Sequence, residues 1–112
     1  MVYAKTQLFD EYFQICSEFY KALGHPARLA ILKYLAETKT CITSDFAEEL
    51  PLSRTTVNQH LTELKDAGLI VSHVEGTKTY YCLNPKKIKE FKKKSESFIK
   101  KINVGNNYSC KK

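Results

Sequence analysis

The chain has 112 residues, enough for one compact domain, and its 43% hydrophobic and 27% charged residues are typical of a folded globular protein rather than a disordered one. No apolar run approaches the roughly 20 residues of a membrane-spanning helix, and the amino terminus lacks the apolar core of a signal peptide, so a cytoplasmic protein without a membrane partner is expected. The net charge of +6 is uneven: residues 1–84 hold 8 basic and 10 acidic side chains, whereas residues 85–112 hold 10 and 2. Such a basic segment favours a polyanion such as DNA, and a lysine face kept for solubility is the alternative.

The first segment, residues 3–23, predicts a helix that is apolar around much of its circumference. One stripe at helical spacing consists of Leu8, Tyr12, Ile15, Phe19 and Leu23, and a second consists of Phe9, Phe13, Cys16 and Tyr20. A helix this apolar usually packs on two sides, and in a small domain the second side is often a partner subunit.

The next helix is predicted from Pro26, which suits the first helical position, to about Thr38. Its inward residues are predicted to be Leu29, Ile31, Leu32 and Leu35. Arg28 has either a structural role or a phosphate contact. A short extended link, with room for one short strand, follows at residues 39–42.

Residues 44–66 predict a helix-turn-helix. A first helix over Ser44–Leu50 directs Phe46, Ala47 and Leu50 inward and ends at Pro51. The second helix begins at Ser53, whose hydroxyl can cap the first turn, and ends at Ala67 and Gly68. Val57, Leu61 and Leu64 recur at spacings of four and three, which places them on one buried face. The other face is polar and consists of Arg54, Thr55, Asn58, Gln59 and Thr62.

A β-hairpin and a last helix complete the predicted domain. Residues 69–74 and 79–83 are rich in β-branched side chains, and the turn at residues 75–78 contains a glycine, so they form a wing. The tip of this wing is expected to offer Thr77 and Lys78 to the DNA phosphates or the minor groove. The last helix, from 86 to about 102, has an apolar seam that the first helix can cover, consisting of Ile88, Phe91, Phe98 and Ile102 with Ser95. The fold class is therefore mainly α (α+β), a winged helix-turn-helix of five helices and a two-stranded wing over residues 1–102, with a flexible tail over 103–112.

Three stretches of the chain resemble the ArsR/SmtB family of winged-helix repressors. They are LGHPARLAIL, LPLSRTTVNQHLTELKDAGLI and EGTKTYYCLNP, which together cover roughly residues 15–85. The resemblance implies a homodimer built from the first and last helices, which binds double-stranded DNA at an operator with two-fold symmetry and is released by a metal ion or other effector. Paired reading helices suit half-sites about one helical turn, roughly 34 Å, apart.

The family pattern implies that polar residues early in the second helix of the motif read bases. On this chain they are Arg54, Thr55, Asn58 and Gln59, with Ser53 and Thr56 near the DNA backbone and Thr62 on the same face. Amide side chains suit adenine and an arginine suits guanine. For His60 two roles stay open, a DNA contact and a half-buried residue hydrogen-bonded within the domain, and the second is favoured. The dimer interface is expected to consist of Leu8, Tyr12, Ile15, Phe19, Ile88, Phe91, Phe98 and Ile102.

The cysteines give only a weak indication of other chemistry. Cys16, Cys41, Cys82 and Cys110 show neither a CxxC pair nor zinc-finger spacing, so reduced, structural thiols and no bound metal or cofactor are expected. The alternative is a thiol or soft-metal sensor that uses Cys41 with Cys82 or Cys16, since Cys41 precedes a helix amino terminus. No nucleophile–base pair or phosphate loop indicates an enzyme.

A winged helix that only assembles with other proteins is the second functional hypothesis. The short polar side chains of Thr55, Asn58 and Gln59 argue against it, because solvated helix faces usually carry Lys and Glu. DNA binding that weakens with salt separates the two hypotheses.

Overall fold

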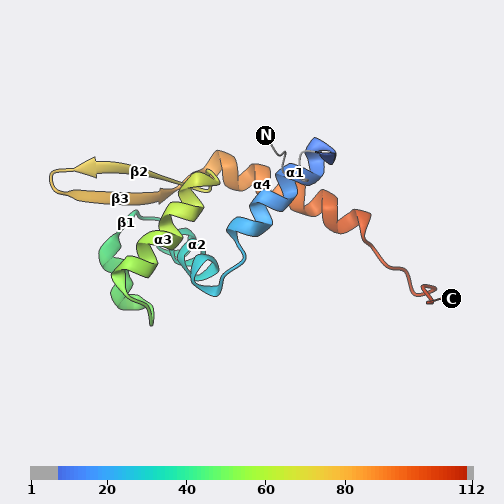
Figure 1. The fold of residues 1–112 in the computed structure, drawn as a ribbon, viewed down its shortest axis with the longest axis horizontal. Coiled ribbons are helices and arrows are strands. Elements are labelled where there is room, and N and C mark those ends of the chain that lie inside the picture. Colours follow the sequence, from blue (N-terminus) through green and yellow to red (C-terminus); the bar gives the residue numbers. More distant parts are fainter. Residues whose placement is uncertain (1–7, 111–112) are drawn as a thin grey trace.

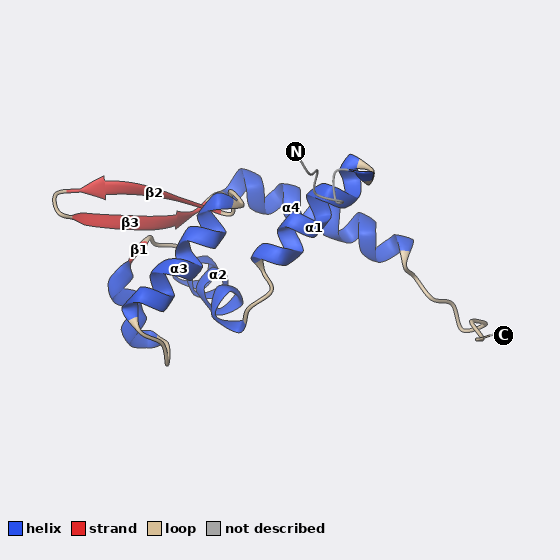
Figure 2. Ribbon diagram, viewed as in Figure 1, coloured by secondary structure: helices blue, strands red, loops and turns tan. Residues whose placement is uncertain are grey.

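The computed structural model describes residues 8–110, apart from the side chains at positions 47 and 48. Within that range the elements are α1 (Glu11–Ala22), α2 (Pro26–Thr38), β1 (Ile42–Thr43), the 3-10 helix η2 (Ser44–Glu49), α3 (Arg54–Asp66), β2 (Ile70–Glu75), β3 (Lys78–Leu83) and α4 (Pro85–Lys101) (Figure 2). The predicted winged helix-turn-helix is confirmed. Two details differ: the first helix of the motif is a 3-10 helix, and the sheet has three strands instead of two. The additional strand is β1, at the end of the link where the sequence left room for one short strand.

The elements form two lobes (Figure 1). The helix-turn-helix and the wing make up one lobe, and α1 packed on α4 makes up the other, as the two predicted apolar stripes require. Residues 103–110, the described part of the predicted tail, are exposed and extend beyond the second lobe. Between residues 8 and 110, no helix has the length and apolar character needed to cross a bilayer.

The core lies where α3 packs on α2 and on the start of β2. Its fully buried side chains are Ile31, Leu35, Val57, Leu61, Leu64, Leu69 and Ile70. The predicted inward face of α3 is therefore confirmed. Leu29 was expected to be buried as well, but 53% of its surface is exposed, because α2 directs Ile31 and Leu35 inward and Leu29 falls on the opposite side.

Short-range signals set the ends of α3. The hydroxyl of Ser53 accepts a hydrogen bond from the amide of Thr56 at 3.2 Å, which satisfies one free donor of the first turn. After Ala67, Gly68 adopts a φ of 81°, a conformation that side chains with a Cβ rarely adopt. The Asn84 side chain then donates to the Gly68 carbonyl at 3.0 Å, so the start of α4 is fastened to the end of α3.

The wing is part of a three-stranded antiparallel sheet with the order β1-β3-β2. The β2–β3 pairing runs from Ile70 opposite Leu83 to Glu75 opposite Lys78, which leaves a two-residue turn. Gly76 takes the first turn position with a φ of 63°, as hairpins of this length often require. The strand β1 pairs with the other edge of β3. The wing therefore joins the sheet at its root instead of standing alone.

The first helix begins later than predicted. Asp10 caps it by accepting a hydrogen bond from the Tyr12 amide at 3.1 Å, so α1 starts at Glu11 and the neighbours Leu8 and Phe9 precede it. The predicted helical positions 3–7 and the predicted inward side chain of Ala47 lie outside the described residues.

A polar cluster around the buried His60 joins α1, α2 and α3. The Arg28 guanidinium donates from Nε to His60 Nδ1 at 3.1 Å and from Nη1 to the Lys21 carbonyl at the end of α1, also at 3.1 Å. The His25 ring lies 4.2 Å from the His60 ring. Of the two roles expected for Arg28, the structural one is thus observed. Burial lowers the pKa of His60 below 6.5, and the nearby charges of His25 and Arg28 lower it further, whereas Glu63 opposes the shift.

This cluster predicts a loss of stability in acid. Because folding disfavours the imidazolium of His60, the unfolded chain takes up this proton at a higher pH than the folded chain. The contribution of His60 to the free energy of unfolding is therefore complete above the unfolded pKa of 6.5, and it is lost as the pH falls below that value. In His60→Asn, an amide oxygen replaces the acceptor Nδ1 without titrating, so urea midpoints measured from about pH 7.5 to about pH 5 should vary less than those of the natural sequence.

The matched control is Thr77→Asn, at the exposed tip of the wing, which removes no titratable group and should keep the full dependence on pH. Equal pH profiles for His60→Asn and the natural chain, at one protein concentration, would contradict the assignment.

Candidate nucleic-acid interface

The outer face of α3 carries the polar side chains that the sequence singled out. Arg54, Thr55, Gln59 and Thr62 are exposed, and Asn58 is half-buried between them. Thr55, Asn58, Gln59 and Thr62 line one shallow depression together with Glu63. Because Val57, Leu61 and Leu64 are fully buried on the opposite side of the helix, this face must point outward.

Ser53 and Thr56 lie at the amino-terminal end of the same helix. Their hydroxyl oxygens are 3.0 Å apart, in addition to the capping bond from the Thr56 amide. The remaining amides of the first turn and the helix dipole make this end attractive to an anion.

Asp45 links the start of α3 to the tip of the wing. Its carboxylate lies 2.5 Å from a guanidinium nitrogen of Arg54 and 3.9 Å from the ammonium of Lys78. Arg54 and Lys78 were both expected to contact DNA, and one carboxylate from η2 brings them to the same edge of the molecule. All three side chains are more than half exposed, so the pairs add little stability but orient both cations.

His60 does not share the outer face. Only 6% of its surface is exposed, and its ring packs between Arg28 and His25. The side chain therefore takes the second of the two expected roles, although it is buried rather than half-buried.

Two acids at this surface were not identified from the sequence. Glu63 lies one turn after Gln59 in the depression, a spacing that the sequence does contain. Asp45 had no such signal, because it meets Arg54 and Lys78 only through the folding of three separate elements. The tip residue Thr77 is exposed, as expected.

The excess of lysines in α4 lies elsewhere. Lys87 packs against Gly68 at the carboxy-terminal end of α3, away from Ser53. Lys86, Lys89 and Lys93 line a separate depression along α4. The net positive charge of the chain is therefore not concentrated on the predicted reading face.

Cys41 and Cys82 are joined by a disulfide bond, which corrects the expectation of four reduced thiols. They come together because β1 pairs with β3. The third sensor candidate, Cys16, is buried on α1 as a free thiol, and Cys110 is free and exposed in the tail. In the part of the chain that the structure describes, no three side chains of His, Cys, Asp or Glu are placed to hold a metal ion.

Comparison with known proteins agrees with this architecture. A family model described as a helix-turn-helix domain matches residues 23–73. An uncharacterized helix-turn-helix-type transcriptional regulator of Methanocaldococcus jannaschii is 36% identical over 80 residues, which cover 71% of this chain and 90% of that protein. The arsenical resistance operon repressor of Bacillus subtilis is 34% identical over 85 residues, which cover 75% of this chain and 76% of the repressor.

Solved structures show the same fold. The crystal structure of a possible transcriptional regulator for arsenical resistance aligns with a TM-score of 0.65 at 29% identity, covering 70% of this chain and 81% of the other. The solution structure of a homodimeric winged helix-turn-helix domain from Mycobacterium bovis, described as a possible ArsR-family regulator, aligns with a TM-score of 0.63 at 22% identity and covers 97% of both chains. With the helix-turn-helix and wing in place, these relatives show that the chain belongs to the ArsR/SmtB family of winged helix-turn-helix transcriptional regulators, which are not enzymes.

Proposed function

We propose that the protein is a sequence-specific repressor that binds, as a homodimer, an operator with two-fold symmetry. The observation that carries the proposal is the outer face of α3, where short polar side chains stand beside Arg54 and Lys78. Side chains that both donate and accept hydrogen bonds suit base edges in the major groove, and cations at the edge suit the phosphates on either side.

Each side chain has a role in this proposal. Asn58 and Gln59 pair with adenine, and Arg54 pairs with guanine after it leaves Asp45. Lys78 and Thr77 contact phosphates from the wing, and Ser53 and Thr56 contact a phosphate at the end of α3. The Asn58 Oδ1 atom is buried and has no hydrogen-bond partner within the described chain, so nothing holds the amide in place when it turns outward to meet a base. A base amino group would satisfy it.

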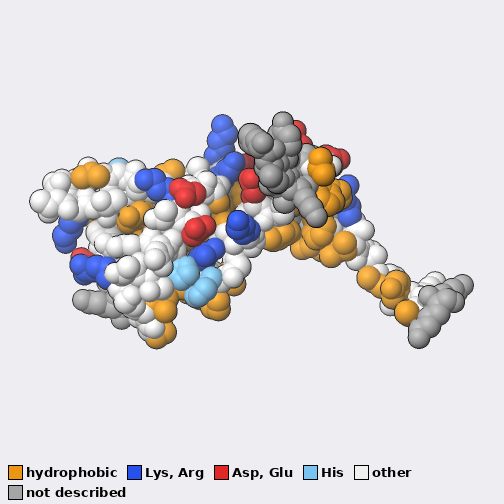
Figure 3. All heavy atoms as spheres, viewed as in Figure 1, with side chains coloured by type: hydrophobic (Ala, Val, Ile, Leu, Met, Phe, Trp, Pro, Cys, Tyr) orange, Lys and Arg blue, Asp and Glu red, His pale blue; other side chains and the backbone are white. Residues whose placement is uncertain are grey.

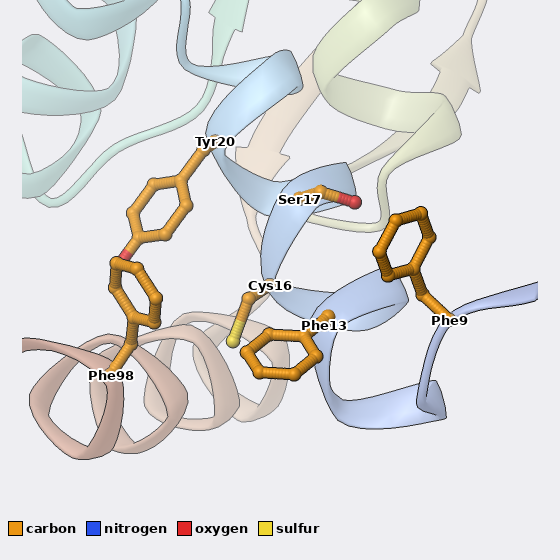
Figure 4. A pocket seen from close by; sticks show the side chains of 6 residues that line it. All are labelled: Phe9, Phe13, Cys16, Ser17, Tyr20 and Phe98. Atoms are coloured by element: carbon orange, nitrogen blue, oxygen red, sulfur yellow. The ribbon is translucent and has the colours of Figure 1, made fainter. Parts of the chain in front are cut away.

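The apolar surface of the α1–α4 lobe supports the homodimer. Hydrophobic side chains gather along this lobe (Figure 3) and surround an apolar hollow between α1 and α4 (Figure 4). The hollow is lined by Phe9, Phe13, Cys16, Ser17, Tyr20 and Phe98. The radius of gyration is 17.3 Å, larger than the about 13 Å typical of a compact domain of this length. A second copy packed on this lobe would cover its apolar surface.

The residues expected at the dimer interface divide into two groups. Phe19 is 4% exposed, and Ile15, Ile88 and Phe91 pack against the same core, so these four side chains hold α1 to α4 within one protomer. Leu8 is 83% exposed and Ile102 is 57% exposed. These two remain in the proposed interface together with the half-buried Phe98 and Tyr12. We add the exposed side chains of Phe9, Phe13, Tyr20 and Ile99 to the proposal.

The first prediction concerns base reading. With a duplex selected by the protein from a random pool, Asn58→Ala or Gln59→Ala should cost about 1–3 kcal/mol of binding free energy, because each removes a two-point contact to a base. Lys78→Ala should instead weaken all duplexes alike and lower the salt slope by about 1. Fluorescence anisotropy over a series of salt concentrations measures both effects.

Lys93→Ala, on α4, is the matched control and should leave the affinity unchanged. If no duplex is bound in a salt-dependent manner, the protein-assembly hypothesis replaces this proposal.

The second prediction concerns the dimer. Phe13→Glu places a charge in the apolar hollow and should yield a folded monomer whose operator affinity falls by about 100-fold or more, since the second half-site no longer adds avidity. Sedimentation equilibrium and anisotropy provide the two readouts. Leu29→Glu, at an exposed apolar position on α2, is the control and should stay dimeric. A dimeric Phe13→Glu variant would place the interface elsewhere.

A further inference from the structure

The disulfide between Cys41 and Cys82 lies where β1 meets β3. Ile42 pairs with Tyr81 and Thr43 pairs with Tyr80, so the next residues outward, Cys41 and Cys82, are direct cross-strand neighbours. Their Cα atoms are 4.4 Å apart, close to the about 4.5 Å of a pair that exchanges no backbone hydrogen bonds. The bond therefore joins two strands at a position that the fold itself creates.

The bond fastens the wing to the first helix of the DNA-binding motif. The strand β1 contains only two residues and continues directly into η2, whose Asp45 holds Arg54 and Lys78. The strand β3 is the return strand of the wing. Without the covalent link, β1 would be held by two residue pairs with β3 and by the buried side chain of Ile42, and so short a pairing is weak by itself.

The sulfur atoms are accessible to small molecules. Cys41 is exposed and Cys82 is half-exposed. Both border a hollow of about 280 Å³ that Lys39 and Thr40 also line. His73 Nδ1 lies 3.9 Å from the sulfur of Cys82. A cation and an imidazole close to the bond favour a departing thiolate, and thiol exchange requires both access and a stabilised leaving group.

We propose that Cys41–Cys82 is a site of reversible thiol–disulfide exchange, whose state sets the affinity of the winged helix for its operator. The proposal rests on the proposed function and names its regulation. The co-reactant is a low-molecular-weight thiol and its disulfide, of the glutathione class.

The exchange proceeds in two displacements. A small-molecule thiolate attacks the sulfur of Cys41, the more exposed of the two residues, the Cys41–Cys82 bond breaks, and Cys82 leaves as a thiolate. A second small-molecule thiolate then attacks the small-molecule sulfur of the mixed disulfide and releases Cys41 as a thiolate. The protein has gained two electrons, the two small thiols have become one disulfide, and solvent supplies the protons that the new thiols take up. The reverse sequence restores the bond.

The oxidised protein is the high-affinity form. With the bond intact, the wing and the helix-turn-helix are held together in the free protein. Binding to DNA then costs little conformational entropy. After reduction the root of the wing must be ordered on the DNA, which lowers the affinity. A coupling of ordinary size would change the affinity by about 5- to 10-fold.

The first test measures DNA affinity against redox state. A Cys16→Ala/Cys110→Ser chain, which keeps only Cys41 and Cys82, is equilibrated in buffers of reduced and oxidised glutathione, and anisotropy is recorded with the selected duplex. Reduction should weaken binding by about 5- to 10-fold. The matched chain carries Cys41→Ser and Cys82→Ser in the same Cys16→Ala/Cys110→Ser background, and it should keep the weaker affinity in every buffer. Equal affinities of the oxidised and reduced chains, or a redox response of the serine variant, would overturn the proposal.

The second test does not depend on DNA. Alkylation followed by mass spectrometry should show Cys41 and Cys82 becoming reactive together across the glutathione series, while hydrogen exchange accelerates in β1 and β3 but not in α3. If the bond opens only when the whole chain unfolds, it is purely structural and the proposal fails. If redox exchange occurs as expected but neither form binds any duplex, the proposed repressor function fails and with it the regulatory part of this proposal, whereas the exchange site stands.

Discussion

The burial of one face of α3 is the constraint on which the rest of the structure depends. Val57, Leu61 and Leu64 have no exposed surface and pack in the core with Ile31 and Leu35 of α2. Each such side chain contributes about 1.5–3 kcal/mol when it leaves water. A helix that commits these positions to the core must direct Thr55, Asn58 and Gln59 outward. The orientation of the proposed DNA-binding face therefore follows from hydrophobic packing and needs no polar contact of its own.

The charged side chains at the edge of that face are oriented by one carboxylate, but they do not hold the fold together. The carboxylate of Asp45 gathers Arg54 and Lys78 at one edge, although exposed pairs of this kind add little stability. Phosphates can replace the carboxylate, since they offer the same acceptor oxygens with the stronger field of a polyanion. The chain is thus acidic in balance over its first 84 residues, yet two of its cations, Arg54 and Lys78, lie together at the edge of the proposed DNA-binding face.

The two lobes of the molecule have different surfaces. The α1–α4 lobe exposes apolar surface that suits a second protomer, and the other lobe carries the helix-turn-helix and the wing (Figure 1). The cross-strand disulfide belongs to the lobe of the helix-turn-helix and the wing, between the end of α2 and the return strand of the wing. A chemical change there reaches η2 through the two residues of β1, without passing through the α1–α4 lobe.

Local signals in the sequence determined the elements, whereas contacts between distant segments decided how several residues are used. Pro26, Ser53 and Gly68 act on their nearest neighbours through fixed torsions and capping bonds, so the bounds of α2 and α3 were predictable, and the spacing of apolar residues assigned the inner face of α3. The core position of Phe19 could not be predicted in this way, because it depends on the packing of α1 on α4. The spacing of apolar residues does not show which of them contact the same chain and which contact a partner.

Likewise, no local pattern predicts that Asp45 pairs with two cations or that Cys41 bonds to Cys82. Residues 41 positions apart in the chain become neighbours only once the register of β1 on β3 is set, and tertiary packing of the whole sheet sets that register.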